Sequence, residues 1–412
     1  MLAQAFRRVR TTLTLAAITI AAVSLLAAAS ADAKAKAPKV TKAPKAPHGL
    51  AFYKPPKKIP KRHGTLIWAR KASGLVPLAG ARYTKLLLYS SRSTDGRRIA
   101  VSGSVAVPKG KPPKGGWPVI TWAHGTTGVA DSCAPTRDFT GTPTPTGETY
   151  INPDLTAWLQ AGYAVVRTDY EGLGTPGTHP YLVGTSEGRS VLDIVSAARQ
   201  LDRTIGKRYL IAGHSQGGHA ALFAAGLAQS WARGLVLRGT VAFAPASHLL
   251  EQSSLLPILT SPSGLSGLIV LILHGASTTS SQVQPSQILS DQALALYPLL
   301  EQECLGQLSQ PNAYGGIAPS NLERPGADTT ALNAALAAMN PAVRSNAPIQ
   351  IEQGTADTTV FKAYTDQLVT ELGGAGNQLT YKTYAGATHG GVVTAGGPDA
   401  LAFFEQQLPP RR

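Results

Sequence analysis

Cysteine is scarce in this chain, and the common cofactor signatures are missing from it. Only Cys133 and Cys304 occur among the 412 residues, and their spacing fits no metal site. There is no dinucleotide-binding fingerprint, no phosphate-binding loop and no zinc signature. Beyond residue 29, no apolar run is long enough to cross a bilayer. The sequence therefore gives no support to nucleotide or zinc chemistry, or to a protein with several membrane spans.

Acidic residues are absent from one strongly basic stretch. Residues 34–62 hold nine lysines and one arginine, which supply most of the formal net charge of +15. Residues 1–33 add a net charge of +2, which leaves only +3 for residues 63–412. Because the folded part is only mildly basic, a nucleic-acid-binding function loses most of its support. The 412 residues suffice for one large domain or two smaller ones, and the 43% of apolar residues allow a substantial core.

The first 33 residues have the organisation of an export signal. Arg7, Arg8 and Arg10 form a positive region, and an apolar stretch follows from residue 11 to residue 29. Residues 31–33, Ala-Asp-Ala, match the small-residue pattern of a cleavage site. We expect a secreted protein whose mature chain begins after this site. The alternative is an uncleaved membrane anchor, since the apolar stretch is borderline in length for a span.

The basic stretch at residues 34–63 is rich in lysine, alanine and proline. Proline disfavours helix and sheet, and like charges repel one another, so this composition predicts an extended linker. We expect a solvated segment. Contact with an anionic cell envelope or lipid surface is the alternative.

The two cysteines are expected to pair. An exported chain meets an oxidising compartment, where two cysteines more often form a disulfide than stay free. The bond would tie the loop near Cys133 to the segment near Cys304. Two unpaired thiols are the alternative.

From about residue 65 onward, short apolar runs alternate with helical patterns, which is typical of an α/β domain. The runs at 163–168 and 208–213 are short and strongly apolar, as buried parallel strands are. The expected strands are 85–90, 98–106, 117–123, 163–168, 208–213, 238–244, 348–353 and 378–384. The expected helices are 152–161, 187–203, 216–231, 361–372 and 398–407.

The alternation breaks down between residues 246 and 346. Apolar runs at 255–259 and 265–273 are too short for a membrane span and lie among many Ser, Pro and Gln residues. They predict a helical cap that presents leucine and isoleucine to an apolar ligand. An ordinary helical subdomain with its own core is the alternative. The cap would interrupt a core formed by residues 64–245 and 347–412.

The motif Gly-x-Ser-x-Gly occurs twice, around Ser186 and around Ser215. A nucleophilic serine in this motif lies on a tight turn between a buried strand and a helix, and the glycines allow the bend. Ser215 follows the apolar run at 208–213 and precedes a helical segment rich in small residues. Ser186 follows a loop rich in proline and glycine, where it fits the N-cap of the helix at 187–203. We therefore predict that Ser215 is a nucleophile and that Ser186 is structural.

A serine hydroxyl needs a base, usually histidine, and an ionised acid that orients the base. In α/β-hydrolases the acid and then the histidine follow the serine along the chain. Asp357 lies in a loop after the strand at 348–353, and His389 lies in a loop after the strand at 378–384. Because no other histidine follows Asp357, these two residues are predicted to be the acid and the base.

Other polar residues near these positions are not assigned to the catalytic set. His214 and His219 flank the turn at the serine and are interpreted as structural. His248 and His274 precede the acid, in or near the cap. Asp169 ends a strand but precedes the nucleophile, so it is interpreted as a residue that shapes its loop.

The oxyanion of a tetrahedral intermediate needs two backbone N–H donors. One comes from the residue after the nucleophile, which is Gln216 here, and the other comes from a loop after an earlier strand. Residues 124–128, His-Gly-Thr-Thr-Gly, form such a loop, and Thr126 is the predicted second donor. Thr127 is the next choice, and a glycine-rich turn without function is the alternative.

Three groups of residues together resemble the secretory lipases, a family that includes fungal lipase A enzymes and exported bacterial relatives. They are residues 124–128 with Cys133-Ala-Pro, residues 169–174 with the sequence Asp-Tyr-Glu-Gly-Leu-Gly, and the turn at Ser215. The resemblance extends over about residues 65–408. It implies an α/β-hydrolase fold, with a mostly parallel central sheet, helices on both faces and a helical cap inserted before the acid-bearing strand. It also implies no cofactor, and a Ser-Asp-His triad at the three residues predicted above.

The resemblance further implies hydrolysis of acylglycerols and other carboxylic esters, with a lipid or another ester as substrate. The fungal members lack the His-Gly loop, so the second oxyanion donor is predicted from this sequence and not from the resemblance. A short-chain, aromatic or polyester esterase is one alternative, and a non-catalytic protein that binds the cell envelope is another. The natural ester and the oligomeric state are left open.

Overall fold

The structure is a computed structural model that describes residues 45–138 and 146–410. The predicted export signal and the first part of the predicted linker lie outside the described residues. Within the described ranges, no helix combines the length and the apolarity that a membrane crossing requires.

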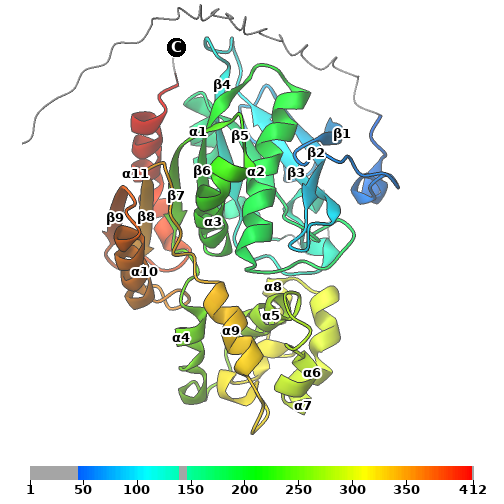
Figure 1. Cartoon of the computed structure of the whole chain (residues 1–412), viewed down its shortest axis with the longest axis vertical. Coiled ribbons are helices and arrows are strands. Elements are labelled where there is room, and N and C mark those ends of the chain that lie inside the picture. Colours follow the sequence, from blue (N-terminus) through cyan, green and yellow to red (C-terminus); the bar gives the residue numbers. More distant parts are fainter. Residues whose placement is uncertain (1–44, 139–145, 411–412) are drawn as a thin grey trace, which may run out of the picture. The chain divides into compact units, whose positions relative to one another are not determined.

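A nine-stranded sheet runs through the described part of the chain (Figure 1). Its spatial order is β1-β2-β3-β5-β4-β6-β7-β8-β9. The pairs from β1 to β5 are antiparallel, and those from β5 to β9 are parallel. The strands are β1 (Leu66–Lys71), β2 (Tyr83–Arg92), β3 (Arg98–Val107), β4 (Trp117–Ala123), β5 (Ala164–Thr168), β6 (Ile205–His214), β7 (Val236–Phe243), β8 (Ile349–Gly354) and β9 (Leu379–Tyr384).

The strand order reverses at β4, because the chain leaves β4 for β5 on one side and returns to β6 on the other. In open α/β sheets, ligands bind outside the carboxyl ends of the strands at such a reversal. A ligand site is therefore expected at the segments that follow β4 and β6.

Alternate residues of the central strands face two helical layers. Tyr209 and Ile211 of β6 pack on one face, whereas Leu210 and Ala212 pack on the other. The first face is covered by α2 (Gly184–Leu201), α3 (Gln216–Trp231) and α10 (Lys362–Gly374). The second face is covered by α1 (Asn152–Gln160) and α11 (Gly391–Gln407). This is the doubly covered sheet that the apolar strands predicted.

Between β7 and β8 the chain forms short helices with an apolar core of their own, and we call residues 249–338 the cap. Figure 1 shows the cap helices gathered at one end of the sheet. They are α4 (Leu249–Ser253), η5 (Leu256–Ile258), α5 (Leu265–Ser277), α6 (Pro285–Ile288), α7 (Asp291–Ala295), η6 (Tyr297–Glu301), α8 (Leu305–Leu308), η7 (Tyr314–Gly316), η8 (Pro319–Asn321) and α9 (Thr330–Ala338). Four further short helices are η1 (Gly49–Tyr53), η2 (Asp131–Cys133), η3 (Pro135–Arg137) and η4 (Glu148–Ile151).

The end of the predicted linker differs from an extended segment. Helix η1 buries Phe52 and Tyr53, and the indole N–H of Trp68 donates to the carbonyl oxygen of Phe52 at 3.0 Å. His63 is hydrogen-bonded to the buried Asp193 at 2.5 Å. The two aromatic side chains give these residues an apolar surface that packs on the edge of the sheet, which a lysine- and proline-rich composition does not indicate.

Two further elements differ from the prediction. Strand β1 was missed, and α11 begins at Gly391 rather than at residue 398, with Pro398 inside the helix. A Cβ at Gly396 would lie 1.6 Å from Oε2 of Glu352. Close packing on the sheet therefore outweighs the low helix propensity of glycine and proline.

Candidate active site

Ser215 occupies a sharp turn between β6 and α3. Its φ and ψ angles are 59° and −117°, a conformation that residues with a side chain rarely adopt. The flanking positions must be glycine because other backbone atoms lie too close to leave room for a Cβ atom. A Cβ at Gly213 would lie 2.0 Å from the carbonyl oxygen of Gly217, and a Cβ at Gly217 would lie 1.9 Å from that of Ala123. This strand–turn–helix context is the one that exposes a nucleophilic serine.

Ser186, in the second copy of the motif, lies in the first turn of α2 and is 1% exposed. Its hydroxyl donates to the carboxylate of Glu171, and the N-cap position belongs to Val183. The prediction that Ser186 caps a helix starting at residue 187 is therefore wrong. The glycines of this copy allow α2 to approach α3: a Cβ at Gly184 would lie 2.1 Å from the ring of Phe223.

Asp357 and His389 are brought together from loops that follow β8 and β9. Nδ1 of His389 lies 2.8 Å from Oδ2 of Asp357. The other carboxylate oxygen accepts the backbone N–H groups of Thr359 and Val360, at 2.8 and 2.9 Å. Burial raises the pKa of Asp357, but the hydrogen bonds from His389 and from these two N–H groups lower it by more. The net result is a pKa below the ordinary value of an aspartate. The carboxylate is therefore ionised at neutral pH.

His214 links the His389 loop to the turn at Ser215. Its Nε2 lies 2.9 Å from the carbonyl oxygen of His389, and the two rings are 4.6 Å apart. The hydroxyl of Tyr150 lies 2.8 Å from Nδ1 of His214. Burial, followed by the proximity of His389, lowers the pKa of His214 to about 3. The neutral ring therefore donates from Nε2 and accepts at Nδ1. Sequence reasoning singled out His214 only as structural and gave no signal for Tyr150.

The two predicted oxyanion donors are the backbone N–H groups of Gln216 and Thr126. No hydrogen bond of residues 45–138 and 146–410 uses the N–H of Gln216 or Thr126 as donor. For Gln216 this is expected, because it begins α3, whereas Thr126 lies in the loop after β4. The Thr126 hydroxyl lies 2.6 Å from that of Tyr181. Thr127 is 1% exposed, and its carbonyl oxygen accepts from Leu305. The backbone N–H of Thr127 likewise donates to no partner within the described residues, so the choice between Thr126 and Thr127 stays a prediction.

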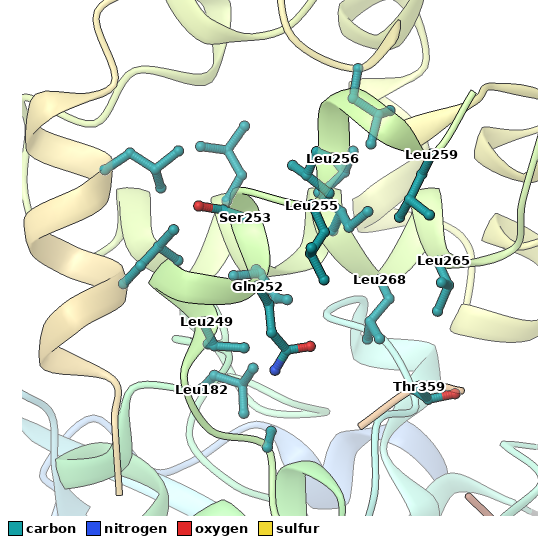
Figure 2. Close-up of a pocket in the computed structure, with 18 of the residues that line it drawn as sticks. Leu182, Leu249, Gln252, Ser253, Leu255, Leu256, Leu259, Leu265, Leu268 and Thr359 are labelled. Carbon is teal, nitrogen blue, oxygen red and sulfur yellow. The ribbon is translucent and has the colours of Figure 1, made fainter. Parts of the chain in front are cut away.

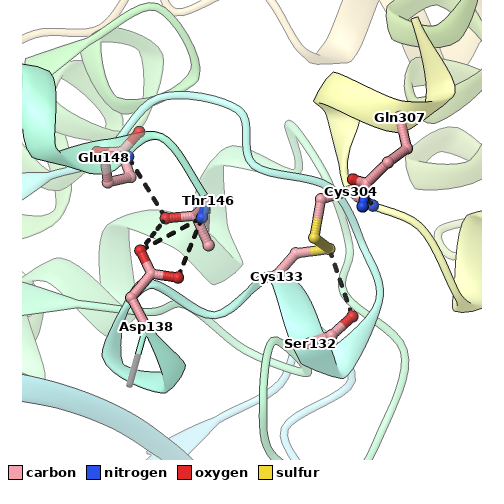
Figure 3. The surroundings of a disulfide bond; sticks show 7 residues. All are labelled: Ser132, Cys133, Asp138, Thr146, Glu148, Cys304 and Gln307. Atoms are coloured by element: carbon pink, nitrogen blue, oxygen red, sulfur yellow. Dashed lines mark hydrogen bonds between the residues drawn. A yellow bond between two sulfur atoms is a disulfide. The ribbon is translucent and has the colours of Figure 1, made fainter. Parts of the chain in front are cut away.

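The loop that carries Thr126 is joined to the cap by a disulfide between Cys133 and Cys304, which confirms the predicted pairing (Figure 3). Both sulfur atoms belong to buried residues. Next to the bond, the N–H of Leu305 donates to the carbonyl oxygen of Thr127 at 2.8 Å. A Cβ at Gly128 would lie 2.9 Å from Sγ of Cys133. The covalent tie therefore lies directly against the loop of the candidate oxyanion donor.

An apolar pocket of about 150 Å³ opens beside Ser215 (Figure 2). The cap supplies most of its lining, and residues near Leu182 and Thr359 complete it. The cap side chains are almost all aliphatic, with Gln252, Ser253 and Glu323 as the polar exceptions. The leucines that Figure 2 labels are Leu182, Leu249, Leu255, Leu256, Leu259, Leu265 and Leu268. A hydrocarbon chain fits this environment better than a charged or strongly polar group.

The doubly covered sheet, the strained serine after β6, and an Asp–His pair from the loops after β8 and β9 define the α/β-hydrolase fold. Across the described ranges, no group of three or more His, Cys, Asp or Glu side chains is arranged to hold a metal ion.

Comparison with known proteins places this fold among lipases and esterases. The family model of secretory lipases matches residues 145–309. Lipase A of Moesziomyces aphidis is 28% identical over 233 residues, which cover 55% of this chain and 47% of that protein. The chain thus matches about half the length of this relative. These findings confirm the similarity to the secretory lipases that the sequence motifs indicated.

Solved structures extend the similarity of fold to most of the chain. Candida antarctica lipase A in its closed state gives a TM-score of 0.71 at 22% identity, covering 86% of this chain and 85% of that one. A rice cell wall degrading esterase from Xanthomonas oryzae gives a TM-score of 0.66 at 19% identity, covering 85% and 100%. At these identities the likeness concerns the fold.

Proposed function

We propose that this protein is a secreted serine ester hydrolase of the lipase or esterase type, with Ser215 as its nucleophile. The observation that carries the proposal is the strained turn at Ser215 together with the Asp357–His389 pair. His214, which precedes Ser215, is hydrogen-bonded to the backbone of His389 and so connects the pair to the turn. The similarity to secretory lipases and, in fold, to the rice cell wall degrading esterase from Xanthomonas oryzae supports the same reaction class. Export is proposed from the signal-like residues 1–33 and from the family description.

The proposed base is His389. Because Nδ1 faces the ionised Asp357, it carries the proton of that hydrogen bond, and Nε2 is left to accept the proton of the Ser215 hydroxyl. The serine oxygen then attacks the ester carbonyl. His389 returns the proton to the leaving alcohol, and water releases the acyl group by the same route. Asp357 stabilises the positive charge on the imidazole during both steps.

The oxyanion is proposed to bind the backbone N–H groups of Gln216 and Thr126. Both groups are free of partners within the described chain, and Gln216 begins a helix, whose N-terminal end favours negative charge. The position of the Thr126 donor is set by the 124–128 loop, whereas that of Gln216 is set by the start of α3.

The proposed substrate is an ester with an apolar acyl chain that extends into the cap pocket. The aliphatic lining beside Ser215 supports this class over acetyl or other short esters. A short-chain, aromatic or polyester esterase is the second candidate, which the cell wall esterase of the same fold favours. Nitrophenyl esters of increasing acyl length discriminate between them, since only the first predicts rising kcat/KM with chain length.

Labelling with a fluorophosphonate probe tests the proposal as a whole. The wild type is expected to react, Ser215→Ala to lose labelling and ester hydrolysis, and Ser186→Ala to keep both. The Ser186 variant is a matched control, because it removes the same group from the same motif at a buried site. Absence of labelling in the folded wild type would favour a non-catalytic protein that binds the cell envelope. Labelling that persists in Ser215→Ala would refute the assignment of the nucleophile.

A further inference from the structure

A fully buried contact between a glutamate and a histidine lies behind the turn at Ser215 and takes no part in the proposed reaction. Oε2 of Glu187, on α2, is 2.8 Å from Nδ1 of His219, on α3, and both side chains are 0% exposed. Removing two polar, ionisable side chains from water is unfavourable unless their contacts are well formed. A buried pair of this kind is expected to hold neighbouring groups in place.

The other carboxylate oxygen of Glu187 holds the side chain of Gln216. The amide nitrogen of Gln216 donates to Oε1 of Glu187 at 2.8 Å, and the backbone N–H of Leu182 donates to the same oxygen at 3.0 Å. The amide nitrogen also lies 3.1 Å from Nε2 of His179. Nδ1 of His179 is 2.7 Å from the carbonyl oxygen of Glu171, so Nδ1 carries the ring proton and Nε2 accepts. Both amide protons of Gln216 thus have an acceptor.

His219 fixes the orientation of the carboxylate. Its Nε2 lies 2.9 Å from the carbonyl oxygen of Met339, the C-cap residue of α9 in the cap. A carbonyl oxygen only accepts, so Nε2 carries a proton, and a second proton lies between Nδ1 and Glu187. Glu187 is therefore held from two sides, by α3 and by the backbone at Leu182. Through His219 it is also connected to the C-terminal end of α9.

We infer that Glu187, oriented by His219, is a positioning residue for the oxyanion hole. The inference rests on the proposed function, in which the backbone N–H of Gln216 binds the oxyanion. The Gln216 side chain is 1% exposed and anchored at its amide end, so the peptide unit that it carries has little freedom to turn. A donor that is fixed before the reaction stabilises the transition state more than one that must reorient.

The inference predicts a defect in the chemical step rather than in substrate binding. Complete loss of one oxyanion donor lowers kcat by about 10²- to 10³-fold. Glu187→Gln keeps the shape and one oxygen acceptor but replaces the carboxyl oxygen that faces His219 with an amide nitrogen, so it loosens the donor without deleting it. We expect kcat to fall about tenfold with KM within about twofold. The affinity for an alkylboronic acid, whose tetrahedral adduct occupies the oxyanion hole, is expected to fall in parallel.

Glu352→Gln is the matched control at pH 7. Glu352 is another 0% exposed carboxyl of the same fold, on β8, and it bonds with Gln350 and Tyr384 rather than with the site. This variant is expected to retain kcat and boronate affinity within about twofold. Should Glu187→Gln retain both to the same degree, the inference is overturned.

A second variant covers the case in which Glu187→Gln does not fold. Gln216→Ala keeps the backbone N–H and removes the anchor, so the same fall in kcat and in boronate affinity is expected. Unchanged values in this variant would overturn the inference while leaving the proposed function intact. A wild type that neither hydrolyses esters nor reacts with the fluorophosphonate would overturn the proposed function, and the inference with it.

Discussion

Nε2 of His214 donates a hydrogen bond to the backbone carbonyl oxygen of His389, although 175 residues separate them in the chain. His214 immediately precedes the proposed nucleophile, and His389 is the proposed base. The contact therefore ties the loop of the base to the turn of the nucleophile without using either catalytic side chain. Because burial keeps the pKa of His214 near 3, no second positive charge forms beside His389 when it accepts a proton.

Tyr150→Phe is expected to lower kcat about fivefold, the size of one modest hydrogen bond. The Tyr150 hydroxyl donates to Nδ1 of His214 and so selects the tautomer whose Nε2 reaches His389. Steady-state kinetics with a nitrophenyl ester measure the effect. Tyr163→Phe is the control, since it removes a hydroxyl that bonds the distant carbonyl oxygen of Leu408 at 3.0 Å. Equal kcat values in the two variants would contradict the role assigned to Tyr150.

Local context was sufficient to predict the turn at Ser215 and most of the sheet. The apolar run before Ser215 predicts a buried strand, and the small residues after it predict a closely packed helix. The structure has β6 and α3 at these positions. Asp357 and His389 were predicted from their places after successive strands, and the carboxyl ends of parallel strands lie at one edge of a sheet. These inferences needed only periodicity and chain order.

Contacts between distant segments could not be predicted in this way. The glycine at 184 is explained only by the ring of Phe223 on another helix, and Ser186 bonds to Glu171 rather than to its own helix end. His214 looked structural because nothing near it in the chain reveals the carbonyl oxygen of His389. Helix α11 continues through Pro398 because the sheet, not the local sequence, determines its packing.

Removal of the disulfide is expected to destabilise the protein and to leave the fold intact. The bond closes a loop of 171 residues between Cys133 and Cys304, so Cys133→Ser/Cys304→Ser is expected to lower the free energy of unfolding by about 2–5 kcal/mol. Denaturant unfolding at fixed pH measures the change. Wild type treated with a reductant should match the double variant. Identical unfolding midpoints for oxidised wild type and the double variant would show that the bond adds nothing to stability.

Glu352 is expected to make stability fall as the pH rises. Burial raises the pKa of Glu352 to about 8, whereas an unfolded glutamate titrates at about 4.3. Between these values the unfolded chain has released the proton and the folded chain has kept it, so raising the pH favours unfolding. Glu352→Gln removes this contribution. Its Tm relative to wild type should therefore increase from pH 5 to pH 9.

Glu251→Gln, which removes an exposed carboxyl from the cap, controls for the change in net charge. Its Tm relative to wild type should not show the same increase between pH 5 and pH 9. A constant difference between Glu352→Gln and wild type over this range would mean that the buried carboxyl titrates as it does in the unfolded chain.

Narrowing the pocket is expected to change chain-length selectivity rather than the chemistry. Leu268 lines the pocket beside Ser215, so Leu268→Trp should lower kcat/KM for octanoate and longer nitrophenyl esters by about tenfold or more and leave the acetate nearly unchanged. The physical reason is volume, because the larger side chain occupies space that a long acyl chain needs. Ile258→Trp places the same side chain on the exposed surface of the cap, where Ile258 is 72% exposed, and should retain the wild-type preference. An equal fall in kcat/KM for all chain lengths in Leu268→Trp would show that the acyl group binds elsewhere. Only a group that lies in the pocket is affected by the space left in it.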